Sequence, residues 1–368
     1  MIQLFVCPRA IARVLLVALL ALCASVATIA QTGTFIDKLR PTDVRVVSYN
    51  LGGFNDGFSD QPFNFTNGQW QFDDNYARVV GSLDADVWAF QEIAQRSSSD
   101  IRSAMNLADP LPNGQSWRVY KFSNQVIASR YAFSDTGANV FGSPRRPTVA
   151  TIDLPDEMAL TDLHLVNIHL KAGGSSSDES RRITDIDRLI QYLREAQIPG
   201  GFDDLEQNTP FVVLGDYNTA AGFNPLINLR DGDIQNEGSF GSDALLDWDG
   251  TQLEIVQARH NLNGSPNWTF ASGSFVSRLD WQMYSDSVMS LAQAFMLNTQ
   301  SLSTAERNAT GLQFSDTSYS GSFVDHIPVV ADYRFRSVVI PEPGLLGLGC
   351  VLAITGLGFG RRFRTIRG

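Results

Sequence analysis

Polar side chains that could bind a metal ion stand at one end of six short apolar segments. Four segments end in the polar group and two begin with it, so a mixed or antiparallel sheet could gather all six groups at one edge. The segments are VRVVSYN (44–50), DVWAFQE (86–92), LHLVNIHL (163–170), FVVLGDYN (211–218), LDWQMY (279–284) and DHIPVVADY (325–333). The polar residues expected in the site are Asn50, Glu92, His169, Asp216, Asn218, Asp280, Asp325 and His326. Hard oxygen ligands with two imidazoles indicate a magnesium-type hydrolase of phosphate esters.

The elements that must position these groups are read from periodicity. Apolar residues at helical spacing predict a helix over 73–83, with Asp73 as a possible cap, and another over 179–196 that starts within Ser175–Asp178. Further strands are expected at 124–129 and 147–153, and long polar loops at 51–72 and 222–265. Strands outnumber helices and are too closely spaced for simple β-α-β winding. The predicted fold is an α/β sandwich with two sheets inside and helices outside.

The N-terminal segment, residues 1–30, has the pattern of a secretory signal peptide. Arg9 and Arg13 precede the apolar run Val14–Cys23, and small residues follow as far as Ala30. A lipoprotein signal is disfavoured, because a bulky leucine stands directly before Cys23. The catalytic domain is therefore expected at residues 31–340, outside the cytoplasm.

The C-terminal segment, residues 341–368, has three parts. Pro341-Glu342-Pro343 is followed by an apolar span, residues 344–360, and then by four arginines between 361 and 367. Seventeen residues are close to the lower limit for crossing a bilayer, and the arginines would hold the far end in the cytoplasm. This ending resembles the PEP-CTERM sorting signal of Gram-negative bacteria, which an exosortase handles during export. A plain C-terminal membrane anchor is the alternative.

Cysteine positions and charge narrow the class of protein. All three cysteines fall in the terminal segments, so the domain at 31–340 has neither disulfides nor a thiolate metal site. Removing both termini takes away six arginines and one glutamate, which leaves 22 basic and 38 acidic residues and a net charge of −16. Such a surface argues against tight, sequence-independent nucleic-acid binding. It still allows a hydrolase with brief substrate contact and a bridging cation.

Each segment taken alone also has an ordinary structural explanation. VRVVSYN reads as a strand that ends in a turn-forming asparagine, and the GDYN sequence at 215–218 reads as an Asx turn. His164 and His169 lie five residues apart on one strand and so face opposite sides, which makes one of them structural. His260 lies in a polar loop and is expected to be solvated.

In their order along the chain, SYN, QE, NIHLK, GDYN, LDWQMY and DHIPV resemble the endonuclease/exonuclease/phosphatase superfamily. The resemblance spans roughly residues 43–335. It implies a four-layer α/β sandwich with two mixed β-sheets packed face to face and helices outside. It also implies a divalent metal cofactor, Mg²⁺ or Mn²⁺, with Ca²⁺ as a further option.

The resemblance assigns roles to the polar residues and leaves His164 as a core or surface histidine. Glu92 would be the principal metal ligand, with Asn50 and Asp325 beside it. Asp216 and Asn218 would hold the attacking water and the phosphate oxygens. His326 would pair with Asp280, and His169 would donate a hydrogen bond to the scissile phosphate.

Three positions depart from the superfamily pattern. Val324 stands where serine is more frequent, and Tyr217 where phenylalanine is usual. Pancreatic-type deoxyribonucleases use a glutamate to orient the histidine that corresponds to His169, and this chain has Asn124 there. Asparagine also suits sphingomyelinases and general phosphodiesterases, so a specific preference for duplex DNA is not expected.

Three functions follow from these patterns. The first is an exported, divalent-metal-dependent phosphodiesterase, most plausibly a nuclease that hydrolyses extracellular nucleic acid. The second is a sphingomyelinase-like phospholipid phosphodiesterase or a phosphomonoesterase, for which the aromatic loop 58–70, with Phe63 and Phe65, could meet a membrane or pack on its own domain. The third is a non-catalytic matrix or adhesion protein. The loops at 51–72, 131–147 and 222–265 would decide the substrate.

The expected partners and location follow from the same observations. The partners are nucleic acid or another phosphodiester substrate, the exosortase, and a membrane that the C-terminal span contacts transiently. The protein is expected outside the cell or on its surface.

Overall fold

The computed structural model describes residues 34–52, 62–137, 146–262, 264, 267–317 and 325–335. The expected signal peptide and sorting tail lie outside these ranges. The chain divides into two compact units, Met1–Asp37 and Lys38–Gly368, and every element below belongs to the second. No helix in the described ranges is long and apolar enough to cross a membrane, and the expected span at 344–360 is not among them.

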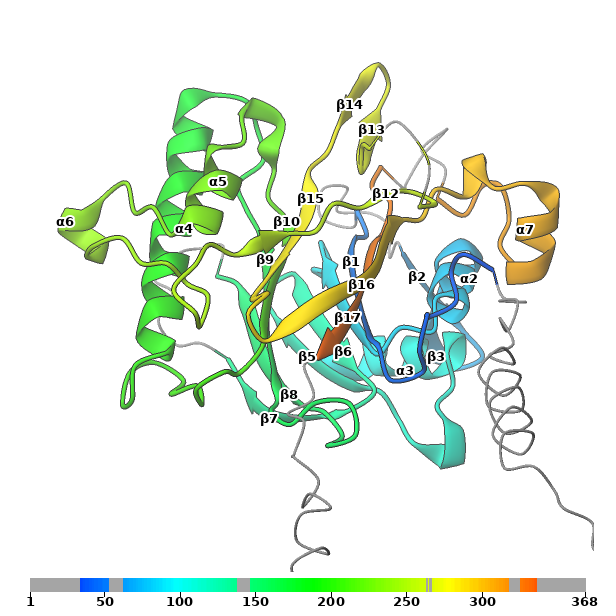
Figure 1. The fold of residues 1–368 in the computed structure, drawn as a ribbon. Helices are drawn as coiled ribbons and strands as arrows, with labels where there is room; N and C mark the ends of the chain where they lie inside the picture. The colour runs from blue at the N-terminus through cyan, green and yellow to red at the C-terminus, as the bar shows by residue number, and fades with distance from the viewer. Residues whose placement is uncertain are drawn as a thin grey trace, which may run out of the picture. The chain divides into compact units, whose positions relative to one another are not determined.

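Two large mixed sheets form the framework (Figure 1). The seven-stranded sheet has the order β12-β16-β17-β1-β4-β6-β5, with β12 Arg259–His260, β16 Met289–Met296, β17 Val329–Phe335, β1 Val44–Asn50, β4 Val87–Gln91, β6 Gln125–Ser129 and β5 Arg118–Phe122. The six-stranded sheet has the order β11-β15-β10-β9-β8-β7, with β11 Glu254–Ile255, β15 Asp280–Tyr284, β10 Phe211–Asp216, β9 Leu163–His169, β8 Thr148–Asp153 and β7 Ala132–Thr136.

The main core lies between the two sheets. Alternate residues of each strand point into this layer, as the two-residue period of a strand requires. The seven-stranded sheet contributes Val44, Val46, Val87, Ala89 and Ile127, and the six-stranded sheet contributes Ile152, Leu163, Leu165, Val212 and Leu214. Residues that point the other way meet the helices. Tyr49 of β1, for example, contacts Tyr76 with the ring centroids 6.0 Å apart.

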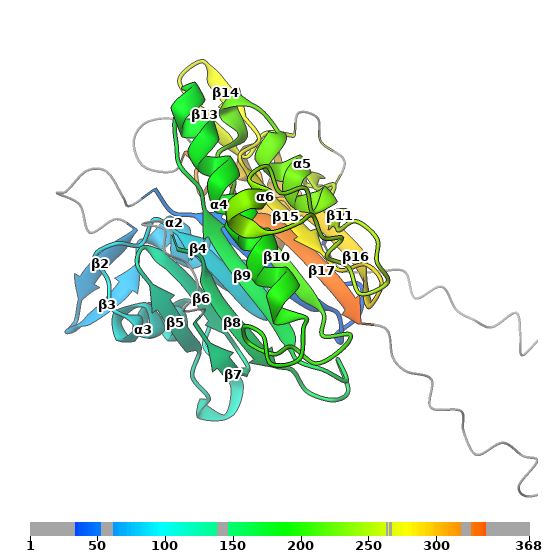
Figure 2. The ribbon, with the colours of Figure 1, turned by 90° about the vertical axis from the view of Figure 1, so that its left-hand side faces the viewer.

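Helices cover the outer faces of both sheets. The helices α4 (Ser176–Ala196) and α5 (Asn224–Asp231) pack on the six-stranded sheet, while α2 (Asp74–Ser82) and α3 (Ser98–Ala108) lie on the seven-stranded side (Figure 2). The apolar stripe of α4 contacts β9 and β10 through Ile186, Leu189, Ile190 and Leu193. This arrangement confirms the expected four-layer sandwich.

The two predicted helices differ at their starts. Ser175 and Asp178 form a reciprocal cap, with each side chain accepting a hydrogen bond from the other residue's backbone N–H at 3.2 Å. The start of α4 was therefore predicted correctly. Asp73 does occupy the N-cap position of α2, as predicted, but its side chain makes no cap hydrogen bond. Its carboxylate instead accepts from Asn64 Nδ2 at 2.8 Å, a partner nine residues away.

The segments expected to be loops contain regular structure. Within 51–72, β2 (Phe63–Thr66) and β3 (Gln69–Phe72) form a hairpin whose Phe63 and Phe72 rings stack at 4.8 Å. Within 222–265 lie α5, the short α6 (Glu237–Phe240), β11 and β12. The limits of α5 have local signals that the periodicity does not reveal, namely Pro225 in its first turn and Gly232 in the left-handed region directly after it.

The described fold also contains a second hairpin, a short helix and three single-turn 3-10 helices, which span Pro112–Gly114, Thr219–Ala221 and Thr299–Ser301. The strands β13 (Phe270–Ser272) and β14 (Phe275–Ser277) form a second hairpin, at the top of Figure 1. The helix α7 (Thr304–Thr310) begins at a reciprocal cap between Ser303 and Glu306. The hairpin matters for the site, because its first strand forms a bridge with His326 through Phe270.

Candidate active site

The polar ends of the strands converge at one edge of the sandwich. In the seven-stranded sheet, β1 and β4 are parallel, and Asn50 lies opposite Gln91, the residue before Glu92. In the six-stranded sheet, Asp216 lies opposite His169 on one side and opposite Asp280 on the other. The site is therefore assembled from both sheets. Asn50 and Glu92 come from one sheet, and His169, Asp216 and Asp280 come from the other.

Asp216 lies at the centre of the site. Its Oδ2 accepts from Asn50 Nδ2 at 3.1 Å and from Asn218 Nδ2 at 3.0 Å, and its Oδ1 accepts from the Asn218 backbone N–H at 2.8 Å. Burial and, next, the charge of Asp280 raise the pKa of Asp216 to about 7, against the opposing effect of His326. The Asx turn that GDYN alone would have explained does form, and its carboxylate also joins the site.

Gly215 allows this arrangement. Its φ of +134° is one that other residues seldom adopt, and a Cβ there would lie 2.0 Å from the carbonyl oxygen of Ile168 on β9. Glycine therefore permits the close approach of β9 and β10 that brings His169 and Asp216 together.

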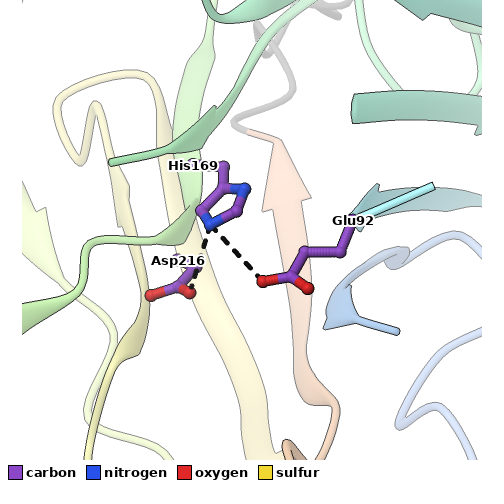
Figure 3. A group of neighbouring side chains, drawn as sticks. All are labelled: Glu92, His169 and Asp216. Atoms are coloured by element: carbon purple, nitrogen blue, oxygen red, sulfur yellow. Dashed lines mark ion pairs between the residues drawn. The ribbon is translucent and has the colours of Figure 1, made fainter. Parts of the chain in front are cut away.

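His169 faces two carboxylates (Figure 3). Its Nε2 lies 3.6 Å from Glu92 Oε1 and 3.8 Å from Asp216 Oδ2. Its Nδ1 lies 3.3 Å from Asn124 Nδ2. Asn124 is the residue that the sequence comparison places where this ring would be oriented. With Asn124 Nδ2 as the donor, Nδ1 accepts, and this assigns the ring proton to Nε2, toward the carboxylates.

Glu92 directly follows β4 and has a left-handed backbone, with φ of +65°. For a residue with a Cβ this conformation costs roughly 1–2 kcal/mol. Such strain persists only where surrounding contacts hold it, and it often marks functional positions. The Glu92 carboxylate accepts from Asn50 Nδ2 at 3.2 Å, which links it to β1.

Asp280 and His326 form a buried pair. His326 Nδ1 lies 2.6 Å from Asp280 Oδ2, and both side chains are almost completely buried. Burial alone would lower the pKa of His326, but the charge and hydrogen bond of Asp280 raise it to about 10. His326 Nε2 points into the site, 4.0 Å from Asp216 Oδ2. Asp280 therefore fixes the orientation of the ring and favours its protonated form.

Asp325 lies outside the two groups of side chains that have the spacing of a metal site. Within the described residues, two groups of His and carboxylate side chains have the spacing of a metal site: Glu92–His169–Asp216 and Asp216–Asp280–His326. Burial and then the Asp325 carboxylate raise the pKa of Tyr76. Asp325 also directly precedes His326 in the chain.

The donor set fits a divalent cation. Glu92, Asp216 and Asp280 bring three carboxylates to one edge, and hard oxygen donors suit Mg²⁺, Mn²⁺ or Ca²⁺. One carboxylate oxygen of Asp325 and one of Asp280 are buried without a hydrogen-bond partner in the described ranges. Buried charges are normally paired or bound to a metal, so this concentration of negative charge favours a cation.

Three contributors to the site were not identified from the sequence. Gln91 and Asn167 form a hydrogen bond between the two sheets directly beneath it, at 2.7 Å. Thr269 accepts the backbone N–H groups of Leu279 and Asp280 at 2.9 and 3.0 Å and so fixes the start of β15. Gln91 and Asn167 lie inside the QE and NIHLK motifs, which gives each of them a signal in the sequence. Thr269 has no local signal.

The other two histidines are buried away from the proposed catalytic groups. His164 is in the core, with Nδ1 2.9 Å from Thr151 Oγ1 and Nε2 2.9 Å from Tyr192 Oη. His260 was expected to be solvated, and that expectation is wrong. Its ring packs edge-on against Trp268, and its nitrogens lie 2.7 Å from the Trp268 carbonyl and 3.1 Å from Asn298 Nδ2.

His164 should make the fold sensitive to acid. Burial lowers its pKa to about 4 from the usual 6.5, so the unfolded chain binds the proton more readily. Its contribution to stability is therefore complete above pH 6.5 and is lost as the pH falls toward 4, by about 3 kcal/mol in total. Urea unfolding of the wild type and His164→Gln at several pH values measures this loss. Equal pH slopes for the two proteins would contradict it.

Comparison with known proteins agrees with the geometry. Residues 47–316 match the model of the Endonuclease/Exonuclease/phosphatase family. Comparison with curated proteins finds no significant sequence match. Similar solved structures include sphingomyelinase C from Streptomyces griseocarneus, at 15% identity and a TM-score of 0.44 over 79% of this chain and 99% of that one.

Two further similar structures come from other organisms. The human nocturnin catalytic domain has 15% identity and a TM-score of 0.46 over 82% of this chain and 96% of that one. A beta toxin variant from Staphylococcus aureus with bound magnesium ions has 13% identity and a TM-score of 0.46 over 79% and 99%. With most of its length matched by the family model, the chain belongs to the endonuclease/exonuclease/phosphatase family and is a hydrolase of phosphate esters.

Proposed function

We propose that this protein is an exported, divalent-metal-dependent phosphodiesterase that acts as a nuclease on extracellular nucleic acid. The observation that carries the proposal is the meeting of two groups at Asp216, namely the Glu92–His169 pair and the buried Asp280–His326 pair. The first combines a carboxylate and an imidazole beside candidate metal ligands. The second supplies a positive charge held in place by a carboxylate.

Each group has a role that its chemistry supports. Glu92, Asn50 and Asp325 would hold the cation, which when bound supplies positive charge at the phosphate and at the leaving oxygen. Asp216, hydrogen-bonded by Asn218, would orient the attacking water. His169 and His326 direct their Nε2 atoms toward Asp216, so both can donate to the phosphate oxygens as negative charge develops.

Two cations next to the β5–β6 turn support a polyanionic substrate. Lys121 and Arg146 flank the turn that carries Asn124. Lys121 Nζ donates to the carbonyls of Ala94 and Ser123, at 3.3 and 2.5 Å, and the Arg146 guanidinium lies 5.9 Å from the centroid of the Phe122 ring. In the described ranges neither side chain forms an ion pair with a carboxylate. On a domain with a net charge of −16, these cations are available to neighbouring phosphates of a nucleic-acid strand.

A phospholipid substrate is the second candidate, and exposed apolar side chains favour it. Phe275 and Val276, on the hairpin beside His326, are 48% and 50% exposed. Of the two phenylalanines in the aromatic loop 58–70, Phe63 is buried in its own domain and Phe65 is 59% exposed. A non-catalytic adhesion role is disfavoured, because chemically competent residues occupy all eight site positions.

Metal dependence and substrate are tested together on purified residues 31–340. Mg²⁺ or Mn²⁺ should support hydrolysis of plasmid DNA or RNA and of bis-p-nitrophenyl phosphate, and EDTA should abolish it, because the proposed ligands are oxygen donors. Sphingomyelin and a phosphomonoester complete the panel. Activity after thorough chelation would refute the metal role, and activity on sphingomyelin alone would establish the second candidate.

The proposed export includes processing of the C-terminal tail by an exosortase. If the tail is a sorting signal, the native exported protein should end near residue 340. Intact-mass spectrometry of the protein recovered from the producing cell measures this end directly. A mature protein that retains residues 361–368 would instead support the plain membrane anchor.

A further inference from the structure

A hydrogen bond between two buried amides joins the sheets beneath the proposed site. Gln91, the last residue of β4, donates from Nε2 to Asn167 Oδ1 of β9 at 2.7 Å. Asn167 in turn donates from Nδ2 to the carbonyls of Phe90 and Val126, at 2.9 and 3.0 Å. Both amide side chains are inaccessible to solvent. A pair with this many bonds fixes the position of β9 relative to β4 and β6.

The pair is adjacent in sequence to two site residues. Glu92 directly follows Gln91, and His169 stands two residues after Asn167 on the same face of β9. These site residues come from different sheets, so no hydrogen bond of a single sheet sets their separation. The hydrogen bond between Gln91 and Asn167 joins the two sheets next to these residues and so sets the separation of Glu92 and His169.

The same pair helps to hold the left-handed backbone of Glu92. The peptide groups on both sides of Glu92 are anchored, because the Gln91 carbonyl accepts from Leu51 N–H at 3.1 Å and Ile93 N–H donates to the Asn124 carbonyl at 2.9 Å. The Gln91 side chain adds a third anchor, on the other sheet. Three anchors around one residue explain how its unfavourable φ of +65° is maintained.

We propose that Gln91 and Asn167 are positioning residues that hold Glu92 opposite His169 and thereby set the affinity of the site for a divalent cation. This inference rests on the proposed role of Glu92 as a metal ligand. Neither amide reaches the site itself. Their effect passes through the backbone of β4 into Glu92 and along β9 into His169.

A second hydrogen bond between the sheets provides a matched control. Tyr333 Oη donates to Gln282 Oε1 at 3.0 Å, which joins β17 to β15. Tyr333 is paired with Val44, at the opposite end of β1 from Asn50. Tyr333→Phe therefore removes one buried hydrogen bond between the sheets away from the site. Gln91→Met removes the amide donor at nearly constant length, and no bond to Oε1 is lost, since that atom has no partner in the described ranges.

The test measures Mn²⁺ binding to the purified protein by electron paramagnetic resonance, together with kcat and thermal melting. Gln91→Met should weaken Mn²⁺ binding and lower kcat by about 10- to 100-fold, as loss of a residue that orients a ligand does. Tyr333→Phe should change Mn²⁺ affinity and kcat by less than about twofold, although its melting temperature should fall about as much as that of Gln91→Met. Equal effects of the two variants would show a purely structural role and overturn the proposal.

Asn167→Ala and the double variant provide an independent measurement. If the amides act as a unit, Asn167→Ala should also weaken Mn²⁺ binding, and the double variant should lose little more than the weaker-binding single variant. Losses of Mn²⁺ affinity that multiply in the double variant would refute the proposal that the two amides act as a unit. If Gln91→Met does not fold, Mn²⁺ binding to Asn167→Ala tests the proposal by itself. Glu92→Gln distinguishes the proposed metal role of Glu92 from the proposed positioning role of the two amides. Unchanged Mn²⁺ binding in Glu92→Gln would refute the proposed metal role of Glu92 itself.

Discussion

Glu92→Gln should lower kcat by about two to three orders of magnitude while the protein stays folded. Glutamine keeps the shape of the side chain and removes the charge that would hold the cation, and loss of one preorganised electrostatic group has effects of this size. Activity should also be sensitive to this position because Glu92 has a strained backbone. Its Oε1 lies 3.6 Å from His169 Nε2 and accepts a hydrogen bond from Asn50 Nδ2. The measurement is kcat at saturating Mg²⁺ or Mn²⁺, with thermal melts to confirm folding.

Glu254→Gln is the matched control for this experiment. Glu254 is an exposed glutamate on β11, at the edge of the six-stranded sheet and outside the site. Glu254→Gln removes one negative charge, as Glu92→Gln does, and the enzyme should keep its wild-type turnover. Near-normal turnover of Glu92→Gln at saturating metal would exclude Glu92 as the principal ligand.

The second large effect is expected at the buried Asp280–His326 pair. If Asp280 acts by orienting and charging His326, then Asp280→Asn and His326→Gln should each remove most of the activity, on the order of a hundredfold or more. The double variant should lose little more than His326→Gln alone, because residues that act as a unit are not additive. The distance of 2.6 Å and the raised pKa of His326 are the structural basis for this expectation.

Four rates at fixed metal concentration complete this cycle. If Asp280 were only a residue at the start of β15, Asp280→Asn would leave turnover nearly unchanged. Losses that multiply in the double variant would refute the functional pair. Asp280 also leaves one buried oxygen without a partner in the described ranges, so melting temperatures must be compared before rates are interpreted.

Local sequence was sufficient to identify most of the strands and the polar residues at their ends. Alternating or continuous apolar runs predict buried strands, and the structure has them. Three of these strands end at Asn50, His169 and Asp216, and Glu92 directly follows a fourth. The position of each polar group at a strand end is also local information. Their order along the chain was enough to indicate the family before any contact was known.

Features that depend on distant partners were not predictable in the same way. His260 has polar neighbours in sequence and was expected in solvent, yet Trp268 and Asn298 enclose it. Asp73 has the residue type of a helix cap but bonds to Asn64 of the β2–β3 hairpin instead. In both cases the deciding contact comes from another element, and propensity does not contain that information.

The sequence by itself determined which side chains stand at strand ends, because the two-residue period of a strand and the length of each apolar run are local properties. Only the tertiary structure decided that Glu92 and His169 come from different sheets, that Asp216 lies between the two groups, and that Glu92 adopts a left-handed backbone. The physical reason is that a strand's pattern specifies which faces are buried but not which strand will lie opposite. Packing of the two sheets makes that choice, and hydrogen bonds such as that between Gln91 and Asn167 hold it in place.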